Sequence, residues 1–233
     1  MKVFISPSNQ YSNTWATGNT NEKAQAIAFA DKLQALLEKQ GVSVVRADDV
    51  HPYSRIDHAK GCDLYIPLHT NAYNKKVRGC RLYVYKKNKN TSTALASKNA
   101  KAMAAIQAEV DKLGMSRKVI VNYDYANWAE LTNATAAGIP AVYSESIFHD
   151  SVEDCNWYFA NVDKLAEAYA KGICEYLGVE YKAITEVPAT NPNTKTFYRV
   201  VAGSFEVRAN ADKRLEEVKA AGFADAFITA VKV

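Results

Sequence analysis

The chain has 233 residues, of which 48% are hydrophobic and 23% are charged. This length suits one catalytic domain with a small appendage, and the composition excludes a disordered polymer. The formal net charge of +4 is too small to indicate nucleic-acid binding. No segment approaches the roughly 20 consecutive apolar residues of a membrane span, so we expect no membrane-spanning helix.

The apolar run at the N-terminus, from Val3 to Ile5, is too short for the core of a signal peptide and predicts a first β-strand. We therefore expect a protein made in the cytoplasm without a signal peptide. The four cysteines form no CxxC pair and no close cluster. Buried free thiols are expected rather than disulfides or a cysteine metal site.

Strands and helices are predicted to alternate over residues 1–178. A helix over 22–40 carries an apolar stripe and stops before Gly41. The other predicted helices are 52–60, 93–113, 127–136 and 162–177, and the other predicted strands are 42–45, 64–68, 80–85 and 140–144. This alternation indicates an α/β fold with a mixed, mostly parallel sheet and helices on both faces.

The composition changes after residue 178. Residues 179–194 include a segment rich in Pro, Asn and Thr, which predicts a linker. A separate β-α-β unit is predicted over 195–233, with a helix at 210–221 between strands at 197–202 and 226–233. A unit of about 40 residues is marginal for independent folding.

Three side chains that carry chemistry are predicted at the ends of strands or at the start of a helix. His69 and Glu145 each follow an apolar strand, and ligands of α/β sheets bind outside the carboxyl ends of the strands. Glu22 begins a helix, where the helix dipole alone would also favour a carboxylate. Zinc hydrolases need His and Glu ligands, an open position for water and a carboxylate that handles the proton.

The segment 62–72, an Asp and an apolar strand that ends in His-Thr-Asn-Ala, resembles a motif of zinc-dependent N-acetylmuramoyl-L-alanine amidases of the amidase 3 type. In that family the His of this motif binds zinc, which implies His69 as a ligand. The segment 19–22 resembles the region of the second ligand and implies Glu22. The cofactor implied by the resemblance is Zn²⁺.

The segment 141–148 resembles the family's late Glu-x-x-Phe motif and implies Glu145 as the catalytic carboxylate. Arg55 lies where the family has its Arg-bearing helix, and Asn71 is implied to orient His69 through a hydrogen bond. The resemblance covers about residues 1–178. It implies hydrolysis, in peptidoglycan, of the amide between N-acetylmuramic acid and L-alanine of the stem peptide.

Two aromatic residues, Tyr73 and Trp128, are candidates for sugar or peptide contact, with aromatic packing as the alternative role of each.

One departure from the family concerns the third zinc ligand. The family has a His in a Gly-His-Gly-like turn after the first strand, whereas residues 6–10 here are Ser-Pro-Ser-Asn-Gln. The third ligand is therefore open between Gln10, Asn9 and His149, and imidazole is a better zinc ligand than an amide oxygen. A water in this position and the loss of zinc are further alternatives. Loss of zinc would leave a non-catalytic cell-wall-binding protein built on a degenerate amidase fold.

The tail resembles the first half of a SPOR domain in the segments 198–205, 208–211 and 219–223. That family binds peptidoglycan glycan strands, which implies a partial wall-binding module over 195–233. A single half either pairs with another copy, giving a homodimer, or packs on the amidase domain. With no signal peptide expected, the resemblance implies action at the bacterial cell wall after endolysin-like release, and an exported host autolysin is the alternative.

Overall fold

The computed structural model describes residues 1–85, 94–115, 128–183 and 202–229. The chain divides into two compact units, Met1–Ala183 and Ile184–Val233. The first unit contains every side chain predicted for the catalytic site.

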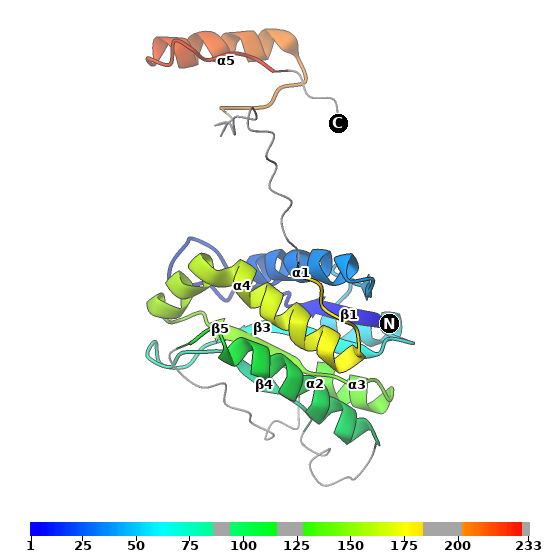
Figure 1. The fold of residues 1–233 in the computed structure, drawn as a ribbon. Helices are drawn as coiled ribbons and strands as arrows, with labels where there is room; N and C mark the ends of the chain where they lie inside the picture. Colours follow the sequence, from blue (N-terminus) through cyan, green and yellow to red (C-terminus); the bar gives the residue numbers. More distant parts are fainter. Residues whose placement is uncertain (86–93, 116–127, 184–201, 230–233) are drawn as a thin grey trace. The chain divides into compact units, whose positions relative to one another are not determined.

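The first unit is built on a five-stranded sheet with the order β2-β1-β3-β5-β4 (Figure 1). The strands are β1 (Lys2–Pro7), β2 (Ser43–Val45), β3 (Leu64–Asn71), β4 (Arg81–Tyr83) and β5 (Tyr143–Phe148). Four of them run parallel, and β4 pairs with β5 in the antiparallel direction. The predicted mixed, mostly parallel sheet is confirmed.

Helices cover both faces of this sheet because successive side chains of a strand point to opposite faces. Val3 and Ile5 of β1 belong to the larger hydrophobic core. This core also includes buried residues of α1 (Glu22–Lys39), α2 (Ala94–Asp111) and α4 (Val152–Leu177). These three helices lie side by side over one face (Figure 1).

The smaller core lies on the opposite face. Phe4 stacks on Tyr65 with ring centroids 5.2 Å apart. This core also contains Leu131 of α3 (Ala129–Ala136) and Ala59, which follows the 3₁₀ helix η1 (Pro52–His58). The face that carries the smaller core is also the face of the candidate site.

Some element boundaries differ from those predicted. β3 extends to Asn71 and β5 extends to Phe148, so His69 and Glu145 lie inside strands and not just after them. α4 begins at Val152 rather than at residue 162, with the hydroxyl of Ser151 accepting a hydrogen bond from a first-turn backbone N–H. The earlier start was available in the sequence, because Ser151 is a preferred N-cap residue and Cys155 and Tyr158 continue the apolar stripe upstream of residue 162.

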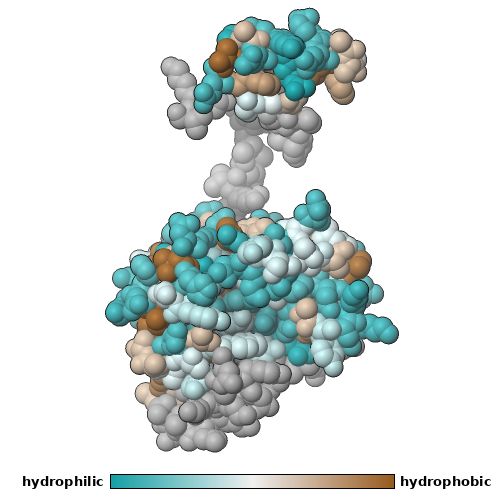
Figure 2. Space-filling model, turned by 180° about the vertical axis from the view of Figure 1, so that it is seen from behind, coloured by the Kyte–Doolittle hydropathy of each residue, from teal (hydrophilic) through white to brown (hydrophobic). Residues whose placement is uncertain are grey.

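All four cysteines are free and buried, as predicted. None of the helices in the described parts of the chain is long and apolar enough to cross a membrane. Hydrophobic residues are scattered on the visible face of the first unit, which is otherwise mostly hydrophilic (Figure 2).

The second unit contains α5 (Arg208–Ala220), which confirms the predicted helix at 210–221. None of the residues of α5 is buried. The strand predicted at 226–233 is absent over 226–229, and residues 230–233 lie outside the described residues. The strand predicted at 197–202 likewise falls almost wholly outside them.

Candidate active site

The predicted site residues gather at the carboxyl ends of the parallel strands, where α/β sheets bind ligands. They come from the loop after β1, the start of α1, strand β3, strand β5 and the residue after β5, and they are Gln10, Glu22, His69, Glu145 and His149. His69 and Glu145 are partners in the parallel register of β3 and β5. Segments far apart in the sequence therefore form one cluster.

The buried imidazole of His69 has a carboxylate at each ring nitrogen. Its Nδ1 lies 2.9 Å from Oε1 of Glu22, and its Nε2 lies 2.9 Å from Oε2 of Glu130. Tyr143 stacks on the ring with centroids 4.5 Å apart and planes 16° apart. Burial lowers the pKa of His69, but the hydrogen bonds to Glu130 and Glu22 outweigh it and raise the pKa to about 10.

Glu22 is fully buried and is held by polar side chains. Asn13 Nδ2 donates to its Oε2 at 2.8 Å, and Gln10 Nε2 donates to its Oε1 at 3.3 Å. Burial raises the pKa of Glu22, but the hydrogen bond and the charge of His69 keep it below its ordinary value. Asn21 caps the helix by accepting a hydrogen bond from a first-turn N–H at 2.9 Å, which positions Glu22.

Glu145 is 7% exposed, and its Oε2 has no hydrogen-bond partner among the described residues. Burial raises the pKa of this carboxyl to about 8, although the charges of His69 and Arg81 oppose the change. Arg81 lies opposite Glu145 in the antiparallel register of β4 and β5. Because an unpaired buried carboxylate oxygen is costly, this atom is suited to a reacting water or a substrate group.

Two candidates for the third ligand approach Glu22. His149 Nδ1 lies 3.9 Å from Oε2 of Glu22 and 2.9 Å from Oγ1 of Thr70. The amide nitrogen of Gln10 lies 3.3 Å from Nδ1 of His69. Asn9 makes no side-chain hydrogen bond to these groups within the described structure.

Glu22, His69 and His149 form a set of one carboxylate and two imidazoles, which zinc hydrolases use. Within residues 1–85, 94–115, 128–183 and 202–229, no three His, Cys, Asp or Glu side chains already stand at the spacing of a closed metal site. Instead, His69 and Glu22 contact each other directly at 2.9 Å. Ligand atoms about 2.0–2.1 Å from a tetrahedral zinc ion are roughly 3.3 Å apart. The donor set therefore fits zinc in its chemistry, and binding would require the His69–Glu22 pair to open and Nδ1 of His149 to leave Thr70, whose Oγ1 lies 2.9 Å and whose carbonyl oxygen lies 3.2 Å away.

Sequence analysis missed Glu130, which lies in the first turn of α3 and is 5% exposed. Its Oε1 accepts hydrogen bonds from Ser6 Oγ at 2.5 Å and Tyr65 Oη at 2.9 Å, while its Oε2 faces His69. An acidic residue in the first turn of a helix is also favoured by the helix dipole. The one available signal was that Glu130 lies between the apolar residues Ala129 and Leu131 in the sequence.

The predicted hydrogen bond from Asn71 to His69 is not made among the described residues. Asn71 Oδ1 accepts from the backbone N–H of Ala72 at 2.8 Å, and carboxylates occupy both ring nitrogens of His69. The physical reason is that the register shift between His69 and Asn71 and the approach of α3 place Glu130 at the ring.

Arg55 is 1% exposed and donates to Ser6 Oγ at 3.0 Å. Its other hydrogen bonds go to the backbone carbonyls of Asp48, Val50 and Pro7. Arg55 is therefore connected to the site through Ser6, and its burial leaves no surface for substrate contact.

The two aromatic candidates differ in exposure. Tyr73, on the loop after β3, is 76% exposed and remains a candidate for substrate contact. Trp128 packs on Tyr83 and Tyr143 with ring centroids 4.8 and 4.3 Å away. Packing therefore accounts for Trp128.

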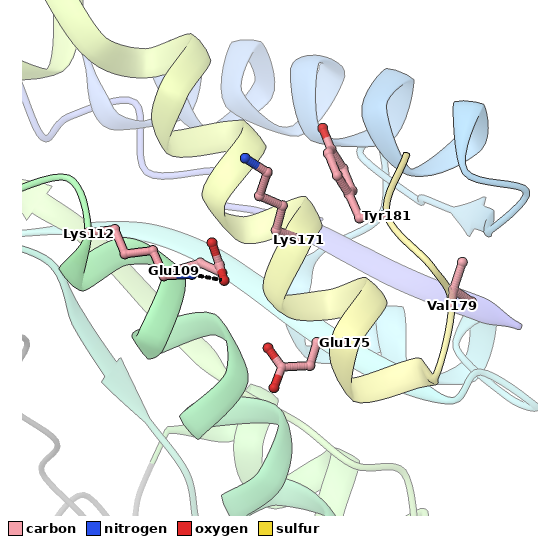
Figure 3. Close-up of a pocket in the computed structure, with 6 residues that line it drawn as sticks. All are labelled: Glu109, Lys112, Lys171, Glu175, Val179 and Tyr181. Atoms are coloured by element: carbon pink, nitrogen blue, oxygen red, sulfur yellow. Dashed lines mark hydrogen bonds and ion pairs between the residues drawn. The ribbon is translucent and has the colours of Figure 1, made fainter. Parts of the chain in front are cut away.

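A separate surface depression lies beside α2 and α4 and is lined by Glu109, Lys112, Lys171, Glu175, Val179 and Tyr181 (Figure 3). Three of its four charged side chains, those of Glu109, Lys112 and Lys171, already have partners. Glu109 pairs with Lys112 at 2.5 Å, and the ammonium of Lys171 lies 5.5 Å from the centroid of the Tyr181 ring. None of the predicted site residues lines this depression.

A mostly parallel sheet with an imidazole between carboxylates at its carboxyl edge is the arrangement of an α/β enzyme with acid–base chemistry. The chain belongs to the N-acetylmuramoyl-L-alanine amidase family, whose family model matches residues 3–175. The family model of the SPOR domain matches residues 164–229. Both predicted resemblances are confirmed.

The sporulation-specific N-acetylmuramoyl-L-alanine amidase of Bacillus subtilis (strain 168) is 25% identical over 235 residues, which cover 96% of this chain and 82% of that protein. The crystal structure of N-acetylmuramoyl-L-alanine amidase from Clostridium difficile 630 is similar with a TM-score of 0.64 and 23% identity, over 76% of this chain and 96% of that one. The structure of the catalytic domain of an endolysin targeting Clostridia difficile is similar with a TM-score of 0.60 and 21% identity, over 75% of this chain and 97% of that one. The two structural likenesses support the predicted fold.

The SPOR match begins inside α4, before the predicted module at 195–233. In the structure α4 belongs to the first unit, where Leu165, Ala166 and Tyr169 are buried in the larger core. The part of the match that lies in the second unit is therefore 184–229.

Proposed function

We propose that the chain is a zinc-dependent amidase that hydrolyses the bond between N-acetylmuramic acid and L-alanine of the stem peptide in peptidoglycan. The observation that carries the proposal is the position of His69, with Nδ1 directed at Glu22 and Glu145 beside it in the strand register. Membership of the amidase family supports the reaction type. The carboxylate and imidazole donors support zinc as the cofactor.

In this proposal Glu22 and Nδ1 of His69 are two of the zinc ligands. His149 is favoured as the third because it lies 3.9 Å from Glu22 and offers an imidazole nitrogen. Gln10 is the alternative, with an amide oxygen as its ligand atom. When bound, zinc would polarise the scissile carbonyl and make a water easier to deprotonate.

Glu145 is the proton carrier in this proposal. Its unpartnered Oε2 accepts a proton from the attacking water as the new C–O bond forms. The same carboxyl then delivers that proton to the L-alanine nitrogen as the C–N bond breaks. The products are the lactyl carboxyl group and the free amino group of the stem peptide. The second proton of the water stays on the new carboxyl group and passes to the amino group or to solvent when that carboxyl ionises, so atoms and protons balance.

For the tail we propose binding to peptidoglycan and pairing with a second copy. The SPOR match supports wall binding. Ala211, Leu215 and Val218 form a half-exposed stripe on α5, which leaves an apolar helix face for a partner. The site of action in this proposal is the bacterial cell wall.

The proposal is tested by zinc content and turnover together. Purified full-length protein should contain about one zinc per chain, lose turnover on purified cell walls after chelation and recover it when zinc is added back. The products should show new L-alanine amino termini. A folded protein that binds walls without zinc and without turnover would instead support the non-catalytic wall-binding alternative.

A further inference from the structure

We propose that Glu130 is a positioning residue that holds the proton of His69 on Nε2 and so leaves Nδ1 as the ligand atom. This inference rests on the proposed function, because it concerns the metal site assigned there. It goes beyond the sequence motifs, none of which includes Glu130.

The direction of the hydrogen bonds around Glu130 follows from the chemistry of its neighbours. A guanidinium has donors only, so Ser6 Oγ accepts from Arg55 Nη1 at 3.0 Å. The hydroxyl proton of Ser6 is then free to be donated to Glu130 Oε1 at 2.5 Å. Tyr65 Oη donates to the same oxygen at 2.9 Å. Two donors therefore hold Oε1, and the carboxylate plane is fixed.

The second oxygen of Glu130 determines the tautomer of His69. An ionised carboxylate only accepts hydrogen bonds, so without zinc both ring nitrogens carry protons: Nε2 donates to Glu130 and Nδ1 donates to Glu22, each at 2.9 Å. When Nδ1 gives up its proton to act as a ligand, Glu130 keeps the remaining proton on Nε2. Ring rotation is blocked because Tyr143 stacks on the imidazole and Glu22 lies at the other nitrogen. A histidine ligand commonly donates its other ring N–H to a carboxylate in this way, which orients the ring and raises its basicity.

The substitution Glu130→Gln distinguishes this role from simple packing. Ser6 and Tyr65 still require an acceptor, so the amide oxygen of the new side chain faces them and its NH₂ group faces His69. Nε2 must then accept a hydrogen bond, which leaves the only ring proton on Nδ1, where it is donated to Glu22. The shape of the side chain is nearly unchanged, but the predicted ligand atom of His69 is blocked.

The test measures zinc affinity by competition with a chromophoric chelator, and it measures the ring tautomer of His69 by ¹⁵N NMR of the full-length protein. Glu130→Gln should weaken zinc binding about 10- to 100-fold, the range seen when such partners are removed. In the zinc-loaded wild-type protein the ring proton of His69 should be on Nε2, whereas in Glu130→Gln it should be on Nδ1. The matched control Glu38→Gln, at an exposed position on α1, should change neither quantity.

The outcomes separate this inference from the proposed function. Equal zinc affinity in wild type and Glu130→Gln, with the proton still on Nε2, overturns the inference and leaves the proposed function intact. Failure of the wild-type protein to bind zinc overturns both. If Glu130→Gln does not fold, the zinc-loaded wild-type protein decides: a His69 proton on Nε2 supports the inference, and a proton on Nδ1 overturns it.

Discussion

His69 and Glu145 are partner residues on the parallel strands β3 and β5, so a buried imidazole and a buried carboxylate lie side by side at the carboxyl edge of the sheet. The imidazole is held by two further carboxylates, whereas Oε2 of Glu145 has no hydrogen-bond partner among the residues that the structure describes. This asymmetry gives the two side chains different tasks. His69 is a fixed group, and Glu145 is free to exchange a proton.

Replacing Glu145 by Gln should reduce turnover on purified cell walls by about 10²- to 10⁴-fold, because the amide cannot accept the proton of the attacking water. Zinc content should stay at the wild-type level, since Glu145 is not one of the proposed ligands. Release of L-alanine amino termini and metal analysis would be measured on the same preparation. Turnover at the wild-type rate would contradict the role of Glu145.

The same substitution should change the pH dependence of stability in zinc-free protein. The folded-state pKa of Glu145 is about 8, against an ordinary value of 4.5, so the unfolded chain releases this proton first as the pH rises. The unfolding free energy of wild type should therefore decrease as the pH rises from the lower to the upper of these two pKa values. Glu145→Gln has no such proton to release and should not show this decrease. Between these two pH values the unfolding free energy of the variant, relative to that of wild type, should rise by up to about 1.4 kcal/mol per pH unit. Above the upper value the difference between the two proteins should stay constant. Urea unfolding with chelator present measures the difference, and a pH-independent difference would contradict the expectation.

The third ligand can be identified by comparing His149→Ala with Gln10→Ala. If His149 is the ligand, its removal should weaken zinc binding far more than removal of Gln10, because imidazole nitrogen is the better zinc donor. Competition with a chelator measures both affinities. The reverse order would assign the position to Gln10.

Asp154 is predicted to stabilise the loop between β3 and β4. Its buried carboxylate accepts hydrogen bonds from Arg78 Nε at 2.9 Å and from the backbone N–H groups of Gly79 and Phe148 at 2.8 and 3.0 Å. Asp154→Ala should cost about 3–5 kcal/mol of unfolding free energy, because it leaves these donors buried without a partner.

Glu153 provides a matched control for Asp154 because it pairs with the same arginine, but its side chain is 71% exposed. Glu153→Ala should cost no more than about 1 kcal/mol. Chemical denaturation of both variants gives the comparison, and equal losses would show that burial is not the deciding factor.

Truncation after residue 194 tests the tail. The shortened protein should fold, because the compact first unit ends at Ala183. It should bind purified cell walls more weakly than the full chain while hydrolysing a small soluble substrate at the same rate. Unchanged wall affinity in a pull-down assay would reduce the tail to a packing element.

Much of this architecture follows from local patterns in the sequence. The alternation of apolar strands and helices indicated the sheet, and polar residues at the carboxyl ends of strands indicated His69 and Glu145. Glu22 was indicated by its place at the start of a helix. The carboxyl ends of β3 and β5 were less predictable, because pairing with neighbouring strands extends them past the local apolar runs.

The tertiary structure alone decided which groups touch His69. Glu130 is 61 residues from His69 in sequence, and no periodic pattern connects the two. They meet because α3 packs on the face of the sheet that also carries Tyr65 and Tyr143. The sequence by itself determined which residues are candidates for acid–base and ligand chemistry. Packing of helix on sheet determined their partners, because a hydrogen bond depends on distance in space and not on separation along the chain.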